Sequence, residues 1–136
     1  MAGLSDYAES GILNALLRGT TFVAPATAAL RMGLFVADPT DAGTLNEVAT
    51  GTWYARKVTG DWNAPSTVGG AQQSSNIAAI TFNAVSGAAA TITHIGIFDA
   101  LTGGNMLFSA PLTSSKTLQI GDVLSFAPGQ VVIQLD

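Results

Sequence analysis

The side chains in this chain that could do chemistry are few, and they do not fall into a known catalytic pattern. His94 is the only histidine, and the chain has no cysteine. No serine lies in a Gly-x-Ser-x-Gly turn, the pattern that presents a nucleophilic serine in many hydrolases. A metal site built from two or three histidines cannot be made from one. The sequence therefore predicts no enzymatic site and no cofactor, and a hydrogen-bonded structural role for His94.

Two glycine pairs and two acidic residues are the remaining candidates for ligand sites. Gly69-Gly70 and Gly103-Gly104 are not followed by the Lys-Ser/Thr of a phosphate-binding loop, so they indicate turns. Asp38 and Asp41 supply two carboxylates where calcium takes six to eight oxygen ligands. We therefore expect these two aspartates to cap turns and not to bind a metal.

Aromatic residues provide the candidates for a protein interface. Trp53 lies in a segment that favours strand, and we expect it in the core. Trp62 lies at the start of a segment with few hydrophobic neighbours, where it could fill the core or anchor an interface, since tryptophan is enriched in interface hot spots. A sugar-binding platform is a third alternative. Phe22 and Trp62 are the candidate interface residues.

The low charge content is the most informative feature of the composition. Charged residues make up 10% of the chain, against about 25% in typical soluble domains. Five cations and nine anions cover thinly the roughly 6,600 Å² that a compact monomer of this mass exposes. Such a surface favours packing against other subunits, although a monomer with a Thr/Ser/Asn-rich surface is the alternative. Because nucleic-acid binding replaces counterions with Lys and Arg, nucleic acid is not expected as a partner.

Targeting and membrane signals are not found in the sequence. The N-terminal residues lack the basic and apolar regions of a signal peptide. No stretch approaches 18 uninterrupted apolar residues, so no membrane association is expected. The chain is expected to be made in a cytoplasm and to stay soluble there until it assembles.

A short helix is predicted at the N-terminus, over Ser5 to Arg18 within residues 1–19. Asp6 can cap its first turn with Glu9 three residues later, and Gly19 is a natural stop. Gly11 in the middle costs about 1 kcal/mol relative to alanine, so the helix must dock on its own sheet or on a neighbouring subunit. The apolar stripe at helical spacing is formed by Ala8, Ile12, Leu13, Leu16 and Leu17.

The rest of the chain, residues 20–136, is expected to be β-structure, with an exposed loop over 60–75. Short runs of β-branched and aromatic residues are separated by turn residues, and no internal repeat is present. This pattern predicts one mainly β domain over residues 1–136, an antiparallel β-sandwich or a jelly-roll-like barrel with a short N-terminal α-helix. The expected strands are 30–37, 52–59, 77–83, 91–99, 106–110, 123–126 and 131–135.

Several short motifs, in this order, resemble a family of small virion proteins of tailed bacteriophages. The resemblance runs nearly from end to end of the chain. The residues that carry it are Leu4–Glu9, Gly33–Pro39, Tyr54–Arg56, His94–Asp99, Gly103–Phe108, Leu112–Lys116 and Gly121–Asp122. Members of this family are often labelled tail-fibre proteins, and comparable small β proteins serve as capsid cement.

The resemblance implies a structural protein of the virion, on the capsid surface or the tail, made in the cytoplasm of a bacterial host. A short globular chain without a fibre-like repeat favours a capsid decoration (cement) protein that bridges major capsid subunits. The alternative is a tail-fibre or tail-tip adaptor or receptor-binding module. A small glycan-acting enzyme is a remote alternative, which would need two carboxylates about 5–10 Å apart, drawn from Asp61, Asp99 and Asp122.

The expected partners are further copies of the chain and the major capsid protein or other virion proteins. The sparse charge and the many small residues motivate a homo-oligomer. A trimer is the expected number, by analogy with the family and with the three-fold positions of capsid lattices.

Overall fold

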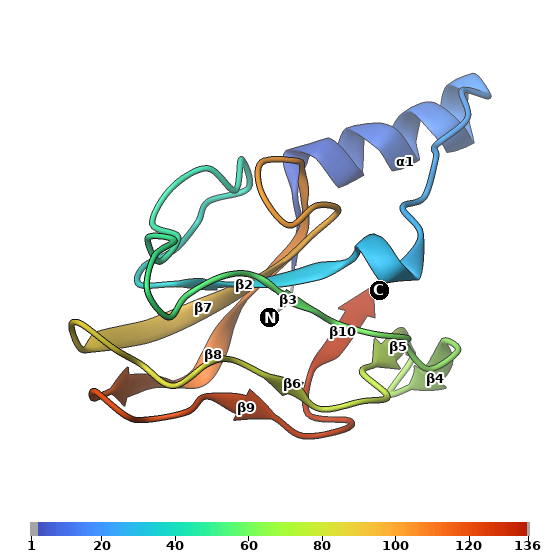
Figure 1. Cartoon of the computed structure of the whole chain (residues 1–136). Coiled ribbons are helices and arrows are strands. Elements are labelled where there is room, and N and C mark those ends of the chain that lie inside the picture. The colour runs from blue at the N-terminus through green and yellow to red at the C-terminus, as the bar shows by residue number, and fades with distance from the viewer. Residues whose placement is uncertain (1–2, 136) are drawn as a thin grey trace.

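The computed structural model describes residues 3–135 and shows a mainly β molecule with one helix near its N-terminus (Figure 1). In chain order, the elements are β1 (Gly3–Leu4), α1 (Asp6–Arg18), the 3-10 turn η1 (Thr27–Ala29), β2 (Arg31–Phe35), β3 (Lys57–Val58), β4 (Ser66–Val68), β5 (Ala71–Ser75), β6 (Ile80–Thr81), β7 (Ala90–Phe98), β8 (Met106–Leu118), β9 (Ser125–Phe126) and β10 (Val132–Leu135).

A five-stranded antiparallel sheet in the order β1-β8-β7-β2-β3 forms the body of the molecule. Its central strand β7 is rich in β-branched residues and pairs with both β2 and β8. Met32 lies opposite Ile97, and Leu34 lies opposite Ile95, so one face of the sheet is continuously apolar. This face carries the main hydrophobic core, to which strands of the two smaller sheets also contribute.

The long strand β8 leaves most of its outer edge open. In the part of the chain that the structure describes, β1 pairs with it only at Phe108 and Ser109. Further along, Pro111 lies opposite His94 at a point where the register with β7 shifts, and Lys116 lies opposite Ile92. The open edge therefore carries a proline, which has no N–H group to donate, and a lysine, which is positively charged.

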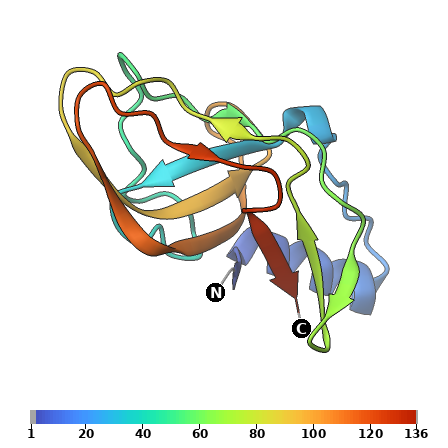
Figure 2. The same cartoon turned by 90° about the horizontal axis from the view of Figure 1, so that it is seen from below.

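Two smaller sheets complete the molecule. Strands β6 and β9 pair beneath the body, and β10, β5 and β4 form a three-stranded sheet that we call the arm (Figure 2). Both views place the arm at the same end of the molecule as the far half of α1. Asn76, which is fully buried, holds the base of the arm: its side chain donates to the carbonyls of Ala78 and Ala127 and accepts from the backbone N–H of Val131.

The mainly β prediction with one N-terminal helix is confirmed. The five-stranded sheet ends in β1 and β3, and the described strands form three antiparallel sheets and no closed barrel. The expected strand over 52–59 shortens to β3, although Trp53 and Tyr54 are buried as core residues.

The structure corrects the start of the helix. The helix was expected over Ser5 to Arg18 within residues 1–19, and it spans Asp6–Arg18. Gly3–Leu4 form β1, and residues 1–2 lie outside the described residues. Ser5, not Asp6, is the N-cap: its hydroxyl accepts a hydrogen bond from the N–H of Ala8 and donates to the carbonyl of Met106. The sheet pairing continues to Ser5 through its N–H to Leu107, so the helix can begin only after it. The predicted stop at Gly19, in the left-handed conformation, is confirmed.

The expectation of an exposed loop over 60–75 is wrong. This segment contains β4 and β5, joined by Gly69 and Gly70, both at positive φ. Two glycines with positive φ are typical of a tight hairpin turn. The strands were missed because their side chains are mostly polar, which hides the alternation that marks a strand.

Candidate functional site

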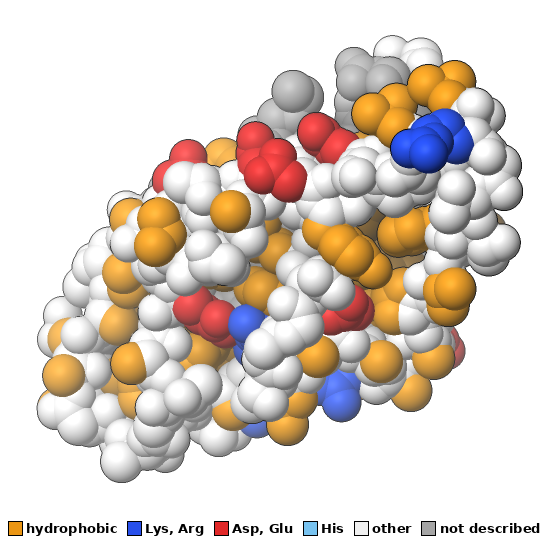
Figure 3. Space-filling model, turned by 90° about the horizontal axis from the view of Figure 1, so that it is seen from above, with side chains coloured by type: hydrophobic (Ala, Val, Ile, Leu, Met, Phe, Trp, Pro, Cys, Tyr) orange, Lys and Arg blue, Asp and Glu red, His pale blue; other side chains and the backbone are white. Residues whose placement is uncertain are grey.

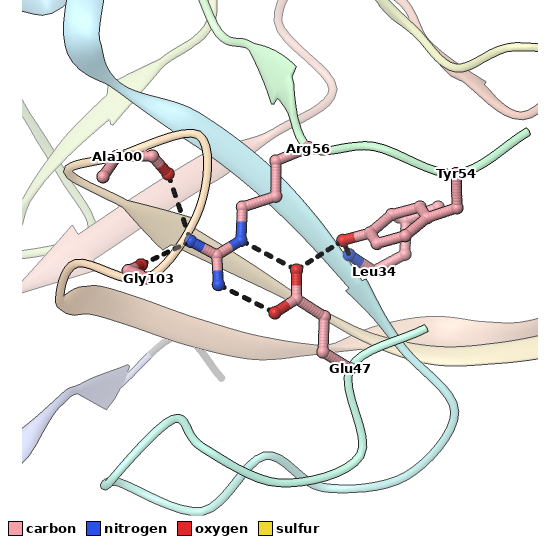
Figure 4. Close-up of polar contacts among 6 residues, drawn as sticks. All are labelled: Leu34, Glu47, Tyr54, Arg56, Ala100 and Gly103. Atoms are coloured by element: carbon pink, nitrogen blue, oxygen red, sulfur yellow. Dashed lines mark hydrogen bonds and ion pairs between the residues drawn. The ribbon is translucent and has the colours of Figure 1, made fainter. Parts of the chain in front are cut away.

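An ion pair organises the loops on the face of the large sheet opposite the main core (Figure 4). The guanidinium of Arg56 donates from Nε to Oε1 of Glu47 at 2.7 Å and from Nη2 to Oε2 at 2.8 Å. Its Nη1 donates to the carbonyls of Ala100 and Gly103 in the β7–β8 turn. Its Cζ lies 3.4 Å from the ring centroid of Phe98. Arg56 therefore ties two loops to the sheet, and we call this group of residues the loop clamp.

Tyr54 joins the loop clamp to the main core. Its hydroxyl donates to Oε1 of Glu47 at 2.7 Å and accepts from the N–H of Leu34 at 3.0 Å. The ring stacks on Phe82 in the core, with centroids 6.2 Å apart. The clamp is thus anchored on both faces of the sheet.

A pair of glycines makes room for the loop clamp. Gly33 of β2 lies opposite Gly96 of β7. A Cβ on Gly96 would lie 2.8 Å from the ring of Phe35, and a Cβ on Gly33 would lie 3.2 Å from Oε1 of Glu47. The two aromatic rings of Phe35 and Phe98 stack over this bare backbone, with centroids 6.0 Å apart.

The loop clamp shifts the titration of its acidic members. Burial by itself would raise the pKa of Glu47, but hydrogen bonds from Arg56 and Tyr54, together with the charge of Arg56, outweigh it and lower the pKa below its ordinary value of 4.5. Burial, followed by the hydrogen bond to Glu47, raises the pKa of the Tyr54 hydroxyl. Glu47 is therefore ionised, and Tyr54 neutral, at neutral pH.

Acid should weaken the fold through Glu47. Because the folded-state pKa is lowered, the folded protein binds fewer protons than the unfolded chain, and the stabilisation is complete above pH 4.5 and lost as the pH falls through the folded pKa. We expect the free energy of unfolding to fall more steeply between about pH 5 and about pH 3 in the wild type than in Glu47→Gln, as measured by urea titration. Glu9→Gln, at an exposed position on α1, is the control and should follow the wild type. Equal acid slopes in Glu47→Gln and the wild type would contradict this assignment.

The loop clamp has the geometry of a structural site. Each of the three guanidinium nitrogens of Arg56 donates to a protein acceptor, and no buried side-chain nitrogen or oxygen among residues 3–135 lacks a hydrogen-bond partner. No cluster of three or more His, Cys, Asp or Glu that could hold a metal occurs in the same residues. The role that this geometry supports is structural: the loop clamp holds the turn between β7 and β8 in one conformation.

Four of the residues considered for chemistry have local structural partners. His94 accepts from or donates to the Thr93 hydroxyl through Nδ1 at 2.8 Å. The Asp38 carboxylate accepts from the N–H of Thr40, which confirms the predicted turn cap there. Asp99 and Asp122 each accept backbone N–H groups within their own turns, from Asn105 and Gln119 respectively. Trp53 is buried in the main core, as predicted.

The two candidate interface residues are both engaged inside the chain. Phe22 is half-buried and packs against Gly11 and the ring of Tyr7, where its position leaves no space for a side chain at residue 11. Trp62 is also half-buried: its Nε1 donates to the hydroxyl of Thr59, and its ring packs at the edge of the main core. Trp62 also lines an apolar cleft, which we describe below.

The far half of α1 exposes a group of leucines. Leu13, Leu16 and Leu17 are 57%, 77% and 77% exposed, and their i, i+3, i+4 spacing places them on one side of the helix. We call them the leucine face. Figure 3, which looks down on α1, shows hydrophobic side chains at the C-terminal end of the helix. Of the predicted stripe only Ala8 is buried, so docking on the chain's own sheet covers the start of the helix alone.

An apolar cleft of about 250 Å³ lies between the arm and the large sheet. We call it the arm cleft. Its lining has no charged residue, and no residue of α1 contributes to it. The residues that line it are Leu30, Trp62, Pro65, Gln72, Gln73, Ser74, Ile97, Leu107, Phe108, Ile133 and Leu135.

Sequence reasoning missed Glu47 and the arm cleft. Arg56 could have indicated a buried ion pair, because it follows Trp53, Tyr54 and Ala55 in a chain with only five cations. No signal in the sequence names Glu47 as its partner. Part of the arm cleft is lined by β5, which was expected to lie in a loop.

Comparisons with known proteins place the chain in one family. No helix among the described residues is long and apolar enough to span a membrane. No curated protein matches the sequence significantly. A family model described as "Podophage GP4 fiber I protein gp80" matches residues 3–134, which is nearly the whole chain. The chain therefore belongs to this family of podophage fibre proteins.

Proposed function

We propose that this protein is a non-enzymatic structural component of a podophage fibre. The observation that carries the proposal is the family model, which describes a podophage fibre protein and spans residues 3–134. A match over this length includes the body, the helix and the arm. The protein then acts in the virion through its surfaces and not through a reaction.

The side chains of the described residues support a structural role. The most polar internal group, the loop clamp, has all of its members paired with one another and with the backbone. Two apolar surfaces, the leucine face and the arm cleft, are open to solvent at one end of the molecule. Open apolar surfaces on a small protein mark sites of protein contact.

Capsid decoration is a second candidate, favoured by the low charge and the globular shape of the subunit. A decoration protein needs contact area on the shell, and 10% charged residues leave much of the surface uncharged. The same surface also suits packing within a fibre. The two roles differ in where the protein lies and in what is lost without it.

Deletion of the protein from a phage that encodes it should distinguish these roles. The fibre role predicts particles with heads of normal thermal stability that fail to adsorb to host cells, with restored adsorption when the protein is supplied from a plasmid. Adsorption is scored by free-phage counts, and head stability by DNA release on heating. Normal adsorption together with DNA release at lower temperature would replace the fibre proposal with capsid decoration.

A further inference from the structure

We propose that the open edge of β8 binds an extended strand of another protein, and that this strand places an acidic side chain beside Lys116. The site consists of the outer edge of β8 over residues 112–117 and the groove beside it, and we call it the edge groove. The proposal goes beyond the fibre role, because it states the chemistry of a partner and does not rest on where in the virion the protein lies.

The backbone of β8 lacks a partner along its outer edge. In the part of the chain that the structure describes, β1 pairs on this side only with Phe108 and Ser109. The inner side is incompletely paired as well, because residues 112–115 of β8 correspond to the single residue Thr93 of β7. Figure 2 shows this half of β8 along the rim of the body. Its free N–H and C=O groups can therefore bind an added strand at the edge that β1 already uses.

A groove of about 680 Å³ lies beside this edge. Apolar side chains from three strands line it, namely Leu112 of β8, Phe126 of β9 and Ile133 of β10. All three pack against the main core but are only partly buried, so the core is incompletely covered on this side. Because a cavity of about 150 Å³ holds a benzene molecule, the groove has room for several side chains of that size.

An extended strand is the occupant that matches both parts of the site. It can pair its backbone with β8 and place every second side chain in the groove. A helix bonds its own backbone groups internally and would leave the edge of β8 unpaired. Since β1 is antiparallel to β8 on this edge, a strand in line with β1 begins near Lys116 and ends near Ser109.

Lys116 selects an acidic residue near the start of the added strand. Lys116 lies opposite Ile92, which is fully buried in the main core. Because directly opposite residues share a face of the sheet, the Lys116 side chain leaves β8 on the core side, where it lines the groove. Among residues 3–135 the only ion pair joins Arg56 and Glu47, so Lys116 has no acidic partner there.

The chain itself does not offer a strand of this chemistry. None of the ten described strands contains an aspartate or a glutamate. The acidic residues described above lie on α1, in turns or in the loop clamp. A strand without an acid would cover the Lys116 cation without pairing it, which costs free energy. The charge of the site therefore favours a different protein over a second copy.

Titration of the ¹⁵N-labelled full chain with synthetic peptides tests the proposal by NMR. The probe is acetyl-Glu-Thr-Val-Thr-Val-Thr-amide, in which the glutamate and both valines share one face. It should bind with a micromolar dissociation constant and shift the amide resonances of residues 112–117. A peptide with glutamine in place of the glutamate should bind about five-fold more weakly. N-methylation of the first valine and the threonine after it should abolish binding, since one of any two successive N–H groups points toward β8.

Lys116 variants test the charge requirement. Lys116→Gln should bind the glutamate and glutamine peptides equally, and Lys116→Glu should prefer a peptide that begins with lysine. Both substitutions are at an exposed position, so the variants should melt at the wild-type temperature. Lys57→Gln removes the same charge outside the groove and should bind the probe as the wild type does.

Four results would each overturn the proposal. They are no resonance shift with the probe at about 1 mM, equal binding of the N-methylated peptide, an unchanged preference for glutamate in Lys116→Gln, and no preference for the lysine peptide in Lys116→Glu. Concentration-dependent shifts of residues 112–117 without any peptide would assign the edge groove to a second copy instead. The fibre role would stand in all of these cases, because adsorption of the deletion phage tests it separately.

Discussion

Replacing Arg56 with methionine is expected to lower the free energy of unfolding by about 3 kcal/mol, because it leaves a partly buried carboxylate and two carbonyls without their charged partner. For a chain of this length the melting temperature should fall by about 10 °C. Urea unfolding, followed by tryptophan fluorescence, gives the free energy. The near-ultraviolet signal of the aromatic residues around Phe98 should change with it, since Arg56 covers that ring.

Two further variants separate the ion pair from the general loss of a cation. Lys57→Met removes the neighbouring charge, which bonds only the exposed side chain of Asn83, and should change stability by less than about 0.5 kcal/mol. Glu47→Leu combined with Arg56→Met removes both charges and should recover part of the loss seen with Arg56→Met alone. If Arg56→Met and Lys57→Met were equally mild, the loop clamp would not hold the fold.

Placing a methyl group on Gly96 is expected to cost about 2–3 kcal/mol, because the new atom would lie 2.8 Å from the ring of Phe35 and 3.0 Å from the sulfur of Met106. The backbone on both sides is paired in the sheet and cannot move away. The Gly96→Ala protein should therefore unfold at lower urea concentration with an unchanged slope. Gly51→Ala is the matched control, since nothing lies within 4 Å of the added atom there.

A second substitution tests whether the clash with the Phe35 ring causes the loss of stability in Gly96→Ala. Phe35→Leu shortens the side chain that the new methyl group would meet. In a double-mutant cycle, Gly96→Ala should cost less in the Phe35→Leu background than in the wild type. An additive result would place the strain elsewhere.

The elements that could be predicted from the sequence are those whose signals are local. The strand over 91–99, the turn from Asp99 to Asn105 and the helix end at Gly19 are confirmed because β-branched runs and glycines act within a few residues. Single residues at the helix start were misassigned, since the cap is decided by the pairing of β1 with β8, more than one hundred residues away.

The loop clamp could not be predicted, for a physical reason. Glu47 and Arg56 lie nine residues apart in irregular segments, where no periodicity relates one side chain to another. Gly33 and Gly96 meet only through the register of β2 and β7. The motifs Tyr54–Arg56, His94–Asp99 and Gly103–Phe108 supported a family resemblance, and residues from all three contribute to the loop clamp or pack against it.

The docking of the helix was left open between its own sheet and a neighbouring subunit. Only Ala8 of the apolar stripe is buried in the described structure, and Leu16 and Leu17 remain uncovered. Hydrophobic spacing identifies an amphipathic helix, but it does not show whether the chain's own sheet or another protein covers each apolar position.

The open edge of β8 bears on whether the protein aggregates before it is built into a virion. Unpaired strand edges recruit further strands and seed aggregates when a protein accumulates to high concentration. Pro111 cannot donate to an added strand, and Lys116 would place a cation against it. These two residues make open-ended β-stacking at this edge unfavourable.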